Sequence, residues 1–192
     1  FLNELNRVIF TTTIRFKAYE YSRAKFNTEE FFWKFFCDNY LEIVKWRVYN
    51  GTKEEKESAF YTLYHSLLTI LKLIAPIMPF ITEKIYRQYF RKNEKEKSIH
   101  ISKWPEFNKK ILEKWTENDI KTLRVNRWFL LTDIISKIRS AKTEAKKSMN
   151  AEIILTLESK IYSALKDLLQ DLKHVTNARE IKEGAQFKVE FL

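Results

Sequence analysis

Hydrophobic residues recur at the three- and four-residue spacing of an amphipathic helix over most of the first 147 positions. In the first helix, Leu2, Leu5, Val8 and Ile9 show this spacing clearly. The predicted helices cover residues 2–18, 22–49, about 52–74, a stretch that begins near residue 79, and 119–147. Long helices joined by short turns predict a mainly α protein built on an antiparallel helix bundle.

Short polar or proline-containing segments separate these helices. The segment KAYEYS follows the first helix, and Asn50-Gly51 ends the second, because glycine suits the positive φ of a helix terminus. Thr52 and Glu55 resemble a capping box, and Pro79 suits the first turn of a helix. The third helix is expected to bury one broad face, formed by Phe60, Leu63, Tyr64, Leu67, Leu68, Leu71 and Ile74.

The stretch FFWKFFCDNYLEIVKWR, residues 31–47, combines many aromatic side chains with many charges. At a period of 3.6 residues its apolar side chains fall on two lines, which predicts a helix packed between neighbours. One line contains Phe32, Phe36 and Ile43, and the other contains Trp33, Cys37, Tyr40, Leu41 and Val44. The polar residues form a narrow strip between these lines, which either makes ion pairs with a neighbouring helix or faces a ligand. This strip consists of Asp38, Glu42, Lys45 and Arg47.

The pattern changes after residue 147. The run EIILTL, residues 152–157, has the β-branched content of a strand, residues 159–173 return to helical spacing, and AREIKEGAQFKVEFL predicts two strands around Gly184. We therefore expect a helical domain over residues 1–147 and a small α/β subdomain over residues 148–192. Within the first domain, SIHISKWP predicts an extended strap near residues 98–107 that crosses the bundle.

The composition of the chain favours some classes of function and excludes others. The formal net charge of +10 favours a polyanionic partner, since clustered cations gain free energy by displacing counterions from phosphates. Two glycines are too few for a glycine-rich phosphate loop, and the three histidines lack the spacing of a metal site. Asp38 and Glu42 lie four residues apart, but nearby lysines explain them as an ion-paired strip rather than a catalytic pair.

The single cysteine, Cys37, excludes an internal disulfide and favours a reducing, cytoplasmic compartment. No apolar run has the length of a membrane span, and the first residues lack the plan of a signal peptide. Because the sequence begins with Phe1, we expect it to be a piece of a longer chain.

Four segments, in order, resemble the valyl-tRNA synthetase family. The family's Cys-Asp-x-Tyr-Leu-Glu signature helix is similar to FFWKFFCDNYLEIVK, and its Pro-x-x-Pro-Phe-Ile-Thr-Glu turn, with the helix before it, is similar to LLTILKLIAPIMPFITEKIY. The family's Trp-Pro strap is similar to SIHISKWPEF, and its first bundle helix is similar to FLNELNRVIF. The resemblance implies the C-terminal anticodon-binding part of a class I enzyme that joins valine to tRNA(Val) with ATP and Mg²⁺. Neither a HIGH-like nor a KMSKS-like motif occurs here, so we expect no catalysis and no cofactor in these residues. The implied partners are tRNA(Val) and the upstream catalytic and editing domains of the same chain, with no membrane.

Candidate tRNA contacts fall in two places. Around the first turn, basic residues alternate with aromatic ones, and the resemblance places this turn and the first helix near the anticodon; the candidates are Asn6, Arg7, Arg15, Tyr21, Arg23 and Lys25. Tyr21 either stacks on a base or closes the turn against the core. The fifth helix carries Arg139, Lys142 and Lys146 at i, i+3 and i+7, which predicts either a cationic face for phosphates or a solvated surface.

Two other functions also fit the pattern. A helical scaffold for protein partners would account for the bundle but not for the basic end of the fifth helix. A basic membrane-surface module would need an amphipathic helix with exposed apolar side chains, whereas the second and third helices are expected to be buried.

Overall fold

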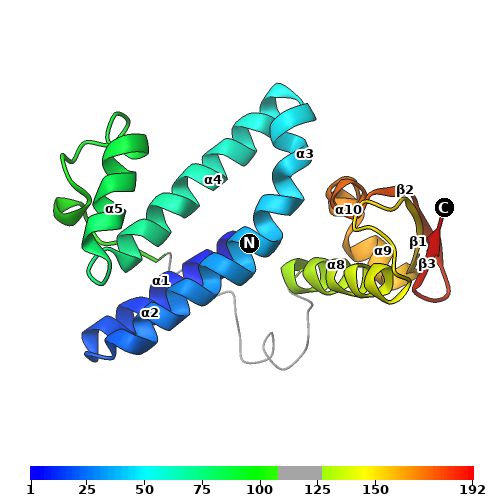
Figure 1. Ribbon diagram of the computed structural model, residues 1–192, viewed down its shortest axis with the longest axis horizontal. Coiled ribbons are helices and arrows are strands. Elements are labelled where there is room, and N and C mark those ends of the chain that lie inside the picture. The colour runs from blue at the N-terminus through cyan, green and yellow to red at the C-terminus, as the bar shows by residue number, and fades with distance from the viewer. Residues whose placement is uncertain (108–126) are drawn as a thin grey trace. The chain divides into compact units, whose positions relative to one another are not determined.

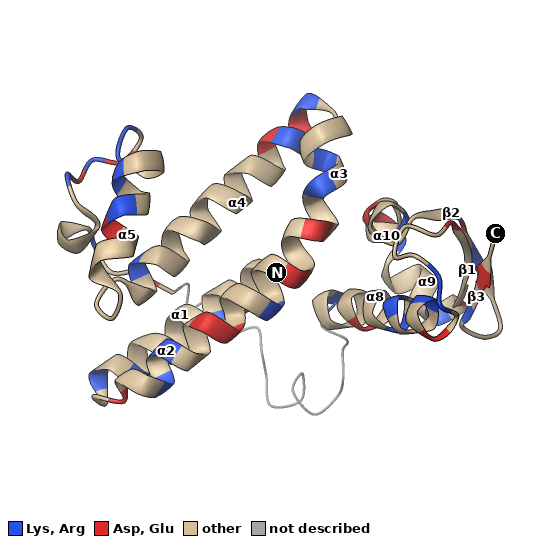
Figure 2. Ribbon diagram, in the orientation of Figure 1, with Lys and Arg blue, Asp and Glu red and all other residues tan. Residues whose placement is uncertain are grey.

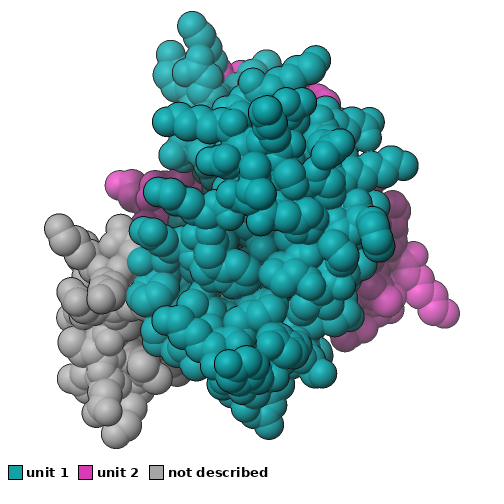
Figure 3. Space-filling view, turned by 90° about the vertical axis from the view of Figure 1, so that its left-hand side faces the viewer, with its two compact units in different colours: residues 1–41, 53–116 teal, residues 42–52, 117–192 magenta. Residues whose placement is uncertain are grey.

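The computed structural model describes residues 1–107 and 127–192, which belong to two compact units. Unit 1 comprises Phe1–Leu41 and Lys53–Thr116, and unit 2 comprises Glu42–Thr52 and Glu117–Leu192 (Figure 3). This division differs from the boundary expected at residue 147. The physical reason is that two helices from the predicted bundle, α3 and α8, pack against the C-terminal α/β segment.

Unit 1 is helical. Its long helices are α1 (Leu2–Lys17), α2 (Tyr21–Glu30) and α4 (Lys53–Ile74), and α1 and α2 lie side by side (Figure 1). The shorter elements are the π-helix η1 (Phe31–Leu41), α5 (Pro79–Ile85), the π-helical turn η2 (Tyr86–Phe90) and the 3₁₀ turn η3 (Ile99–Ile101). The mainly helical architecture expected from the sequence is confirmed.

The π-helix η1 replaces the α-helix expected over the FFWKFFCDNYL stretch. A π-helix bonds from i to i+5, so side chains four and five residues apart share a face. Phe31 stacks on Phe35 with centroids 5.5 Å apart, Phe36 lies 6.4 Å from Tyr40, and the Phe1 ring stacks on Tyr40 at 3.9 Å. These aromatic rings pack against one another and against Phe1 along η1.

The altered winding changes which apolar side chains are buried. Phe31, which lay on neither predicted line, is 2% exposed, whereas Trp33 is 60% exposed, so the prediction that Trp33 packs between neighbours is wrong. Phe60, in the first half of α4, is 53% exposed, because at this level of the helix the neighbouring Ala59 is the buried residue. Among the positions expected there, Leu68 and Leu71 are buried as predicted.

The core of unit 1 lies where α1, η1 and α4 meet. Its buried members are Leu5, Val8, Ile9, Phe31, Phe36, Ile70 and Leu73. The strap crosses this core as expected: Trp104 donates from Nε1 to Oγ1 of Thr13 at 2.8 Å and its ring lies against Phe16. The first residues of the strap are not extended as expected. They form the 3₁₀ turn η3, which places the buried Ile99 in a second apolar cluster together with Tyr86.

Unit 2 places helices against a small sheet. Its helices are α3 (Glu42–Asn50), α8 (Arg127–Glu144), α9 (Ser159–Ala164) and α10 (Leu169–Thr176), with the 3₁₀ turn η4 (Lys166–Leu168) between the last two. The strands are β1 (Ile153–Glu158), β2 (Ala178–Gly184) and β3 (Lys188–Phe191). The predicted strands and intervening helical segment are therefore present. Of the helix expected over residues 119–147, the part before residue 127 lies outside the described residues, and the helix ends at Glu144.

β1 is the central strand of the sheet. The order is β2-β1-β3, with β1 parallel to β2 and antiparallel to β3. Ile153, Leu155 and Leu157 on one face of β1 are fully buried. A Cβ at Gly184 would lie 2.5 Å from Cγ2 of Thr156, so only glycine fits where β2 ends.

Candidate nucleic-acid interface

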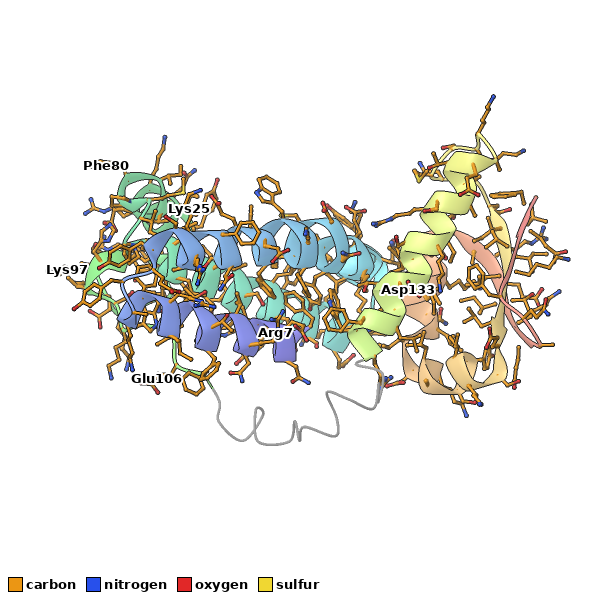
Figure 4. All side chains as sticks on the ribbon, turned by 90° about the horizontal axis from the view of Figure 1, so that it is seen from below. Arg7, Lys25, Phe80, Lys97, Glu106 and Asp133 are labelled. Atoms are coloured by element: carbon orange, nitrogen blue, oxygen red, sulfur yellow. The ribbon has the colours of Figure 1, made fainter. Side chains whose placement is uncertain are left out.

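A groove of about 250 Å³ lies between α1 and the α2–η1 segment of unit 1. One wall comes from α1, where Arg7, Thr11 and Arg15 follow one another at four-residue spacing on the same face. Figure 4 marks Arg7 on this helix. The remaining lining residues are Val8, Asn27, Glu30, Phe31 and Phe35. Antiparallel packing of the two segments therefore brings cations to face an aromatic and amide-bearing wall.

Carboxylates hold the two groove arginines in place. Arg7 donates from Nε to Oε2 of Glu4 at 2.8 Å, and its side chain remains 52% exposed while Glu4 is buried. Arg15 donates from Nη1 to Oε2 of Glu20 at 2.5 Å. Each guanidinium is thus oriented by a neighbouring acid, which leaves both at the groove surface.

At the α1–α2 turn, Glu20 braces two cations. It accepts from Arg15 and also from Arg23, whose Nη1 lies 3.2 Å from Oε1. The hydrogen bond from Arg15 lowers the pKa of the Glu20 carboxyl, opposed by a smaller desolvation effect. The turn itself is tight, with Tyr19 at φ 59. The predicted cations Arg15 and Arg23 are therefore brought together by one carboxylate.

The other predicted residues of this region have different surroundings. Asn6 is only 6% exposed, so the direct RNA contact expected of it is wrong for this surface. Lys25 forms an ion pair with Glu29 at 2.6 Å. Tyr21 is half exposed, and its ring lies 5.7 Å from that of Phe16 and 6.3 Å from that of Tyr19, so it packs against α1 and the turn while part of it remains at the surface.

Sequence reasoning missed the second wall of the groove. Asn27, Phe31 and Phe35 follow at four-residue spacing and face the α1 cations across the groove. Their spacing was visible in the sequence, and pairing it with the spacing of Arg7 and Arg15 on an antiparallel neighbour would have found the groove. The two apolar lines predicted for residues 31–47 contained neither Phe31 nor Phe35, so the prediction left this wall out.

The cationic face predicted on the fifth helix is wrong at its central residue. Lys142 is 1% exposed, and its ammonium donates to the carbonyl oxygens of Met149 and Thr176, each at 2.7 Å. Burial lowers the pKa of Lys142. Lys146 lies beyond the end of α8, with φ 54. Arg139, Lys142 and Lys146 therefore do not form one exposed row of a helix.

Neither a metal site nor a membrane-spanning helix is present within residues 1–107 and 127–192. No group of three or more His, Cys, Asp or Glu side chains there could hold a metal ion. In the same ranges, no helix has the length and hydropathy needed to cross a membrane.

A helical unit with a groove of arginine, asparagine and phenylalanine side chains has the features of an RNA-binding domain. Residues 1–178 match the family described as "Anticodon-binding domain of tRNA ligase", and the chain belongs to this family. The predicted family resemblance is therefore confirmed.

Similar proteins include valine–tRNA ligases from several bacteria. The enzyme of Orientia tsutsugamushi is 40% identical over 97% of this chain and 22% of its own length. Those of Anaplasma marginale and Rickettsia prowazekii are each 36% identical, over 94% and 96% of this chain and 21% and 22% of their own lengths. The chain thus spans about a fifth of the length of the curated relatives it matches.

Proposed function

We propose that this chain binds the anticodon stem-loop of a tRNA, and that the groove between α1 and the α2–η1 segment receives an unstacked base of the loop. The observation that carries the proposal is the composition of the groove, where Arg7 and Arg15 face Asn27, Glu30 and Phe35. RNA loops are recognised by stacking on planar side chains together with hydrogen bonds to base edges and phosphates. The groove supplies each of these groups within one unit.

Each group has a distinct task in this proposal. Phe35 offers a partly exposed ring for stacking, and its contact with Phe31 keeps that ring in position. Asn27 can both donate to and accept from a base edge, and Glu30 accepts from an exocyclic amino group. Arg7 and Arg15 suit the phosphates on either side because their fork of N–H donors matches phosphate oxygens.

The size of the groove agrees with a small occupant. Its volume of about 250 Å³ is below the roughly 300–1,000 Å³ of most small-molecule sites. A single base with its sugar and phosphate outside is a fitting occupant. The net charge of +10 supports this by favouring approach of a polyanion.

We further propose that the tRNA is tRNA(Val) and that the chain acts as the anticodon-binding part of a valine–tRNA ligase. This rests on the identities of 36–40% to enzymes of that name over nearly the whole chain. Valine, ATP and Mg²⁺ would then be handled by other parts of the enzyme, in the cytoplasm.

A fluorescence titration tests the proposal. The chain is titrated with a stem-loop bearing the valine anticodon and with one whose middle base is changed, at two salt concentrations. Tighter binding of the valine loop is expected. Equal, salt-sensitive affinity for both loops would reduce the chain to a phosphate-binding platform, and no measurable affinity for either loop would contradict the proposal.

Substitutions localise the binding to the groove. Phe35→Leu retains an apolar side chain but removes the stacking surface, and is expected to weaken binding by about 1–3 kcal/mol. Arg7→Ala should weaken binding and lower the salt slope by about 0.7 for a single-stranded contact. Arg91→Ala is the matched control, because Arg91 is exposed and does not line the groove.

A further inference from the structure

A Schellman motif ends α1 at the turn before α2. The backbone N–H of Glu20 donates to the carbonyl oxygen of Arg15 at 2.9 Å. The backbone N–H of Tyr19 donates to the carbonyl oxygen of Phe16 at 3.1 Å. Tyr19 occupies the position of the motif that takes the left-handed conformation, with a φ of 59°. Glycine is the usual residue there, because a Cβ makes this conformation costly, and a bulky side chain is rare in it.

Packing within the fold does not explain a tyrosine at this position. Tyr19 is 79% exposed, and its ring meets that of Tyr21 edge to face with centroids 6.3 Å apart. Asn177 ends α10 in the same left-handed conformation, but asparagine is a residue that tolerates it. The chain therefore keeps an exposed aromatic ring on a strained backbone, and strain of this kind is found preferentially at binding sites.

The exposed ring lies beside the end of the groove. Arg15 is the last residue of α1 that lines the groove, and its Nη1 donates to Oε2 of Glu20, the residue directly after Tyr19, at 2.5 Å. The exposed Arg23 donates to the same carboxylate. Figure 2 shows Lys and Arg at this end of α1 and α2. An aromatic face among cations is the combination that binds single-stranded RNA.

We propose that Tyr19 stacks on a second base of the RNA loop, the neighbour of the base held in the groove. Consecutive nucleotides are joined by one phosphate, so a phosphate bound by Arg15 would lie between a base in the groove and the next base along the strand. This inference rests on the proposed function. It adds a contact that the groove does not contain, because Tyr19 is not among its lining residues.

The contact at Tyr19 differs in kind from the contacts in the groove. Stacking uses the face of a base, which all four bases share, so we expect little sequence preference at this second position. Tyr21 has a supporting part, because its ring packs against Phe16 on one side and meets the ring of Tyr19 on the other. Tyr21 therefore helps to hold the Tyr19 ring in position.

The first test is the affinity of Tyr19 variants for the stem-loop that bears the valine anticodon. Tyr19→Leu keeps an apolar side chain and the backbone strain but removes the stacking surface, so binding is expected to weaken about 5- to 150-fold. Tyr19→Phe keeps the ring and should bind like the parent. Tyr89→Leu is the matched control, because Tyr89 is 64% exposed on η2 and does not line the groove. A loss in Tyr19→Phe as large as in Tyr19→Leu would assign the contact to the hydroxyl group and overturn stacking.

The fluorescent base 2-aminopurine, which is quenched by stacking, identifies the nucleotide. It is placed at each position of the loop in turn. We expect one position at which quenching on binding requires Tyr19, directly beside a position at which it requires Phe35. Quenching that Tyr19→Leu leaves intact at every position, or positions that are not neighbours in the strand, would overturn the proposal.

The strain gives a readout that needs no RNA. Asparagine tolerates the left-handed conformation, so Tyr19→Asn should raise the thermal midpoint by about 2–4 °C while it weakens stem-loop binding as much as Tyr19→Leu does. A lower midpoint would show that the ring serves the fold, which contradicts the inference. If the parent binds the stem-loop and Tyr19→Leu binds equally well, only this inference fails. If the parent has no affinity for the stem-loop, the proposed function fails and this inference fails with it.

Discussion

Replacing Lys142 by methionine tests whether the buried ammonium stabilises unit 2. The substitution keeps most of the apolar stem and removes the group that bonds to the carbonyls of Met149 and Thr176. The bond to Thr176 is buried, so its carbonyl would lose its partner without gaining water, whereas the carbonyl of the half-exposed Met149 can be hydrated. An unsatisfied buried acceptor costs about 1–3 kcal/mol.

One effect opposes this loss. The ammonium is itself desolvated, which the lowered pKa of Lys142 expresses, and its removal would relieve that cost. Because the lysine has two acceptors at good distance, we expect the loss to prevail, with the free energy of unfolding reduced by about 2 kcal/mol. Urea unfolding followed by circular dichroism measures this. Lys146→Met, at an exposed position, is the control and should change stability by less than about 0.5 kcal/mol.

The pH dependence gives a second readout of the same group. A lysine whose folded pKa is lowered binds its proton less tightly in the folded than in the unfolded chain. Stability should therefore rise with pH between the lowered pKa and the ordinary value of 10.5, and this rise should be missing from Lys142→Met. A variant as stable as Lys146→Met, or more stable than the parent, would refute the assignment of a stabilising role to the two hydrogen bonds.

Three further predictions concern ionic contacts. Arg47→Leu should reduce the free energy of unfolding by roughly 3 kcal/mol, because it leaves the buried carboxylate of Asp171 without its paired guanidinium. Burial and the nearby charge of Lys173 lower the pKa of His174 in the folded chain. The free energy of unfolding should therefore fall as the pH drops from the ordinary histidine pKa of 6.5 toward the lowered pKa, and His174→Phe should not show this fall. Glu20→Gln should release the arginines it bonds, and so strengthen stem-loop binding and steepen its salt dependence.

Each of these has its own control. Combining Arg47→Leu with Asp171→Leu should recover most of the stability lost in the single variant, since no buried charge remains. For the histidine, the phenyl ring can keep the stack on Trp46, whose centroid lies 3.9 Å away, so an unchanged acid profile would contradict the prediction. For Glu20, a weaker affinity of Glu20→Gln would contradict the prediction, because the orientation that the carboxylate gives Arg15 would then matter more for RNA binding than its competition with phosphates.

The helices and strands were predictable because each leaves a local period in the sequence. Leu68 and Leu71 on α4, and the alternating buried residues of β1, follow directly from that period. The π-helix was not predictable in this way, because its i to i+5 bonds are stabilised by contacts with Phe1, which is distant in sequence. The helical period alone therefore placed Trp33 in the core.

The residues of the candidate site also differ in whether the sequence alone could predict them. Arg7 and Arg15 could be chosen from charge and resemblance, and both line the groove. Asn6 and Lys142 could not be judged from charge or polarity, since their burial depends on which helix face meets a neighbour. Lys142 is the clearest case, because its hydrogen-bond acceptors are the backbone carbonyls of residues 149 and 176, and a pattern of side chains does not predict a backbone acceptor.

The strand order of unit 2 bears on self-association. With β1 in the centre, β2 and β3 each have an outer edge that pairs with no strand among the described residues, and such edges invite pairing with another chain. β2 reads AREIKEG and β3 reads KVEF, so charged side chains recur along both edges. A strand that pairs with either edge would have to desolvate these charged side chains, and charged edge strands of this kind disfavour edge-to-edge association of sheets.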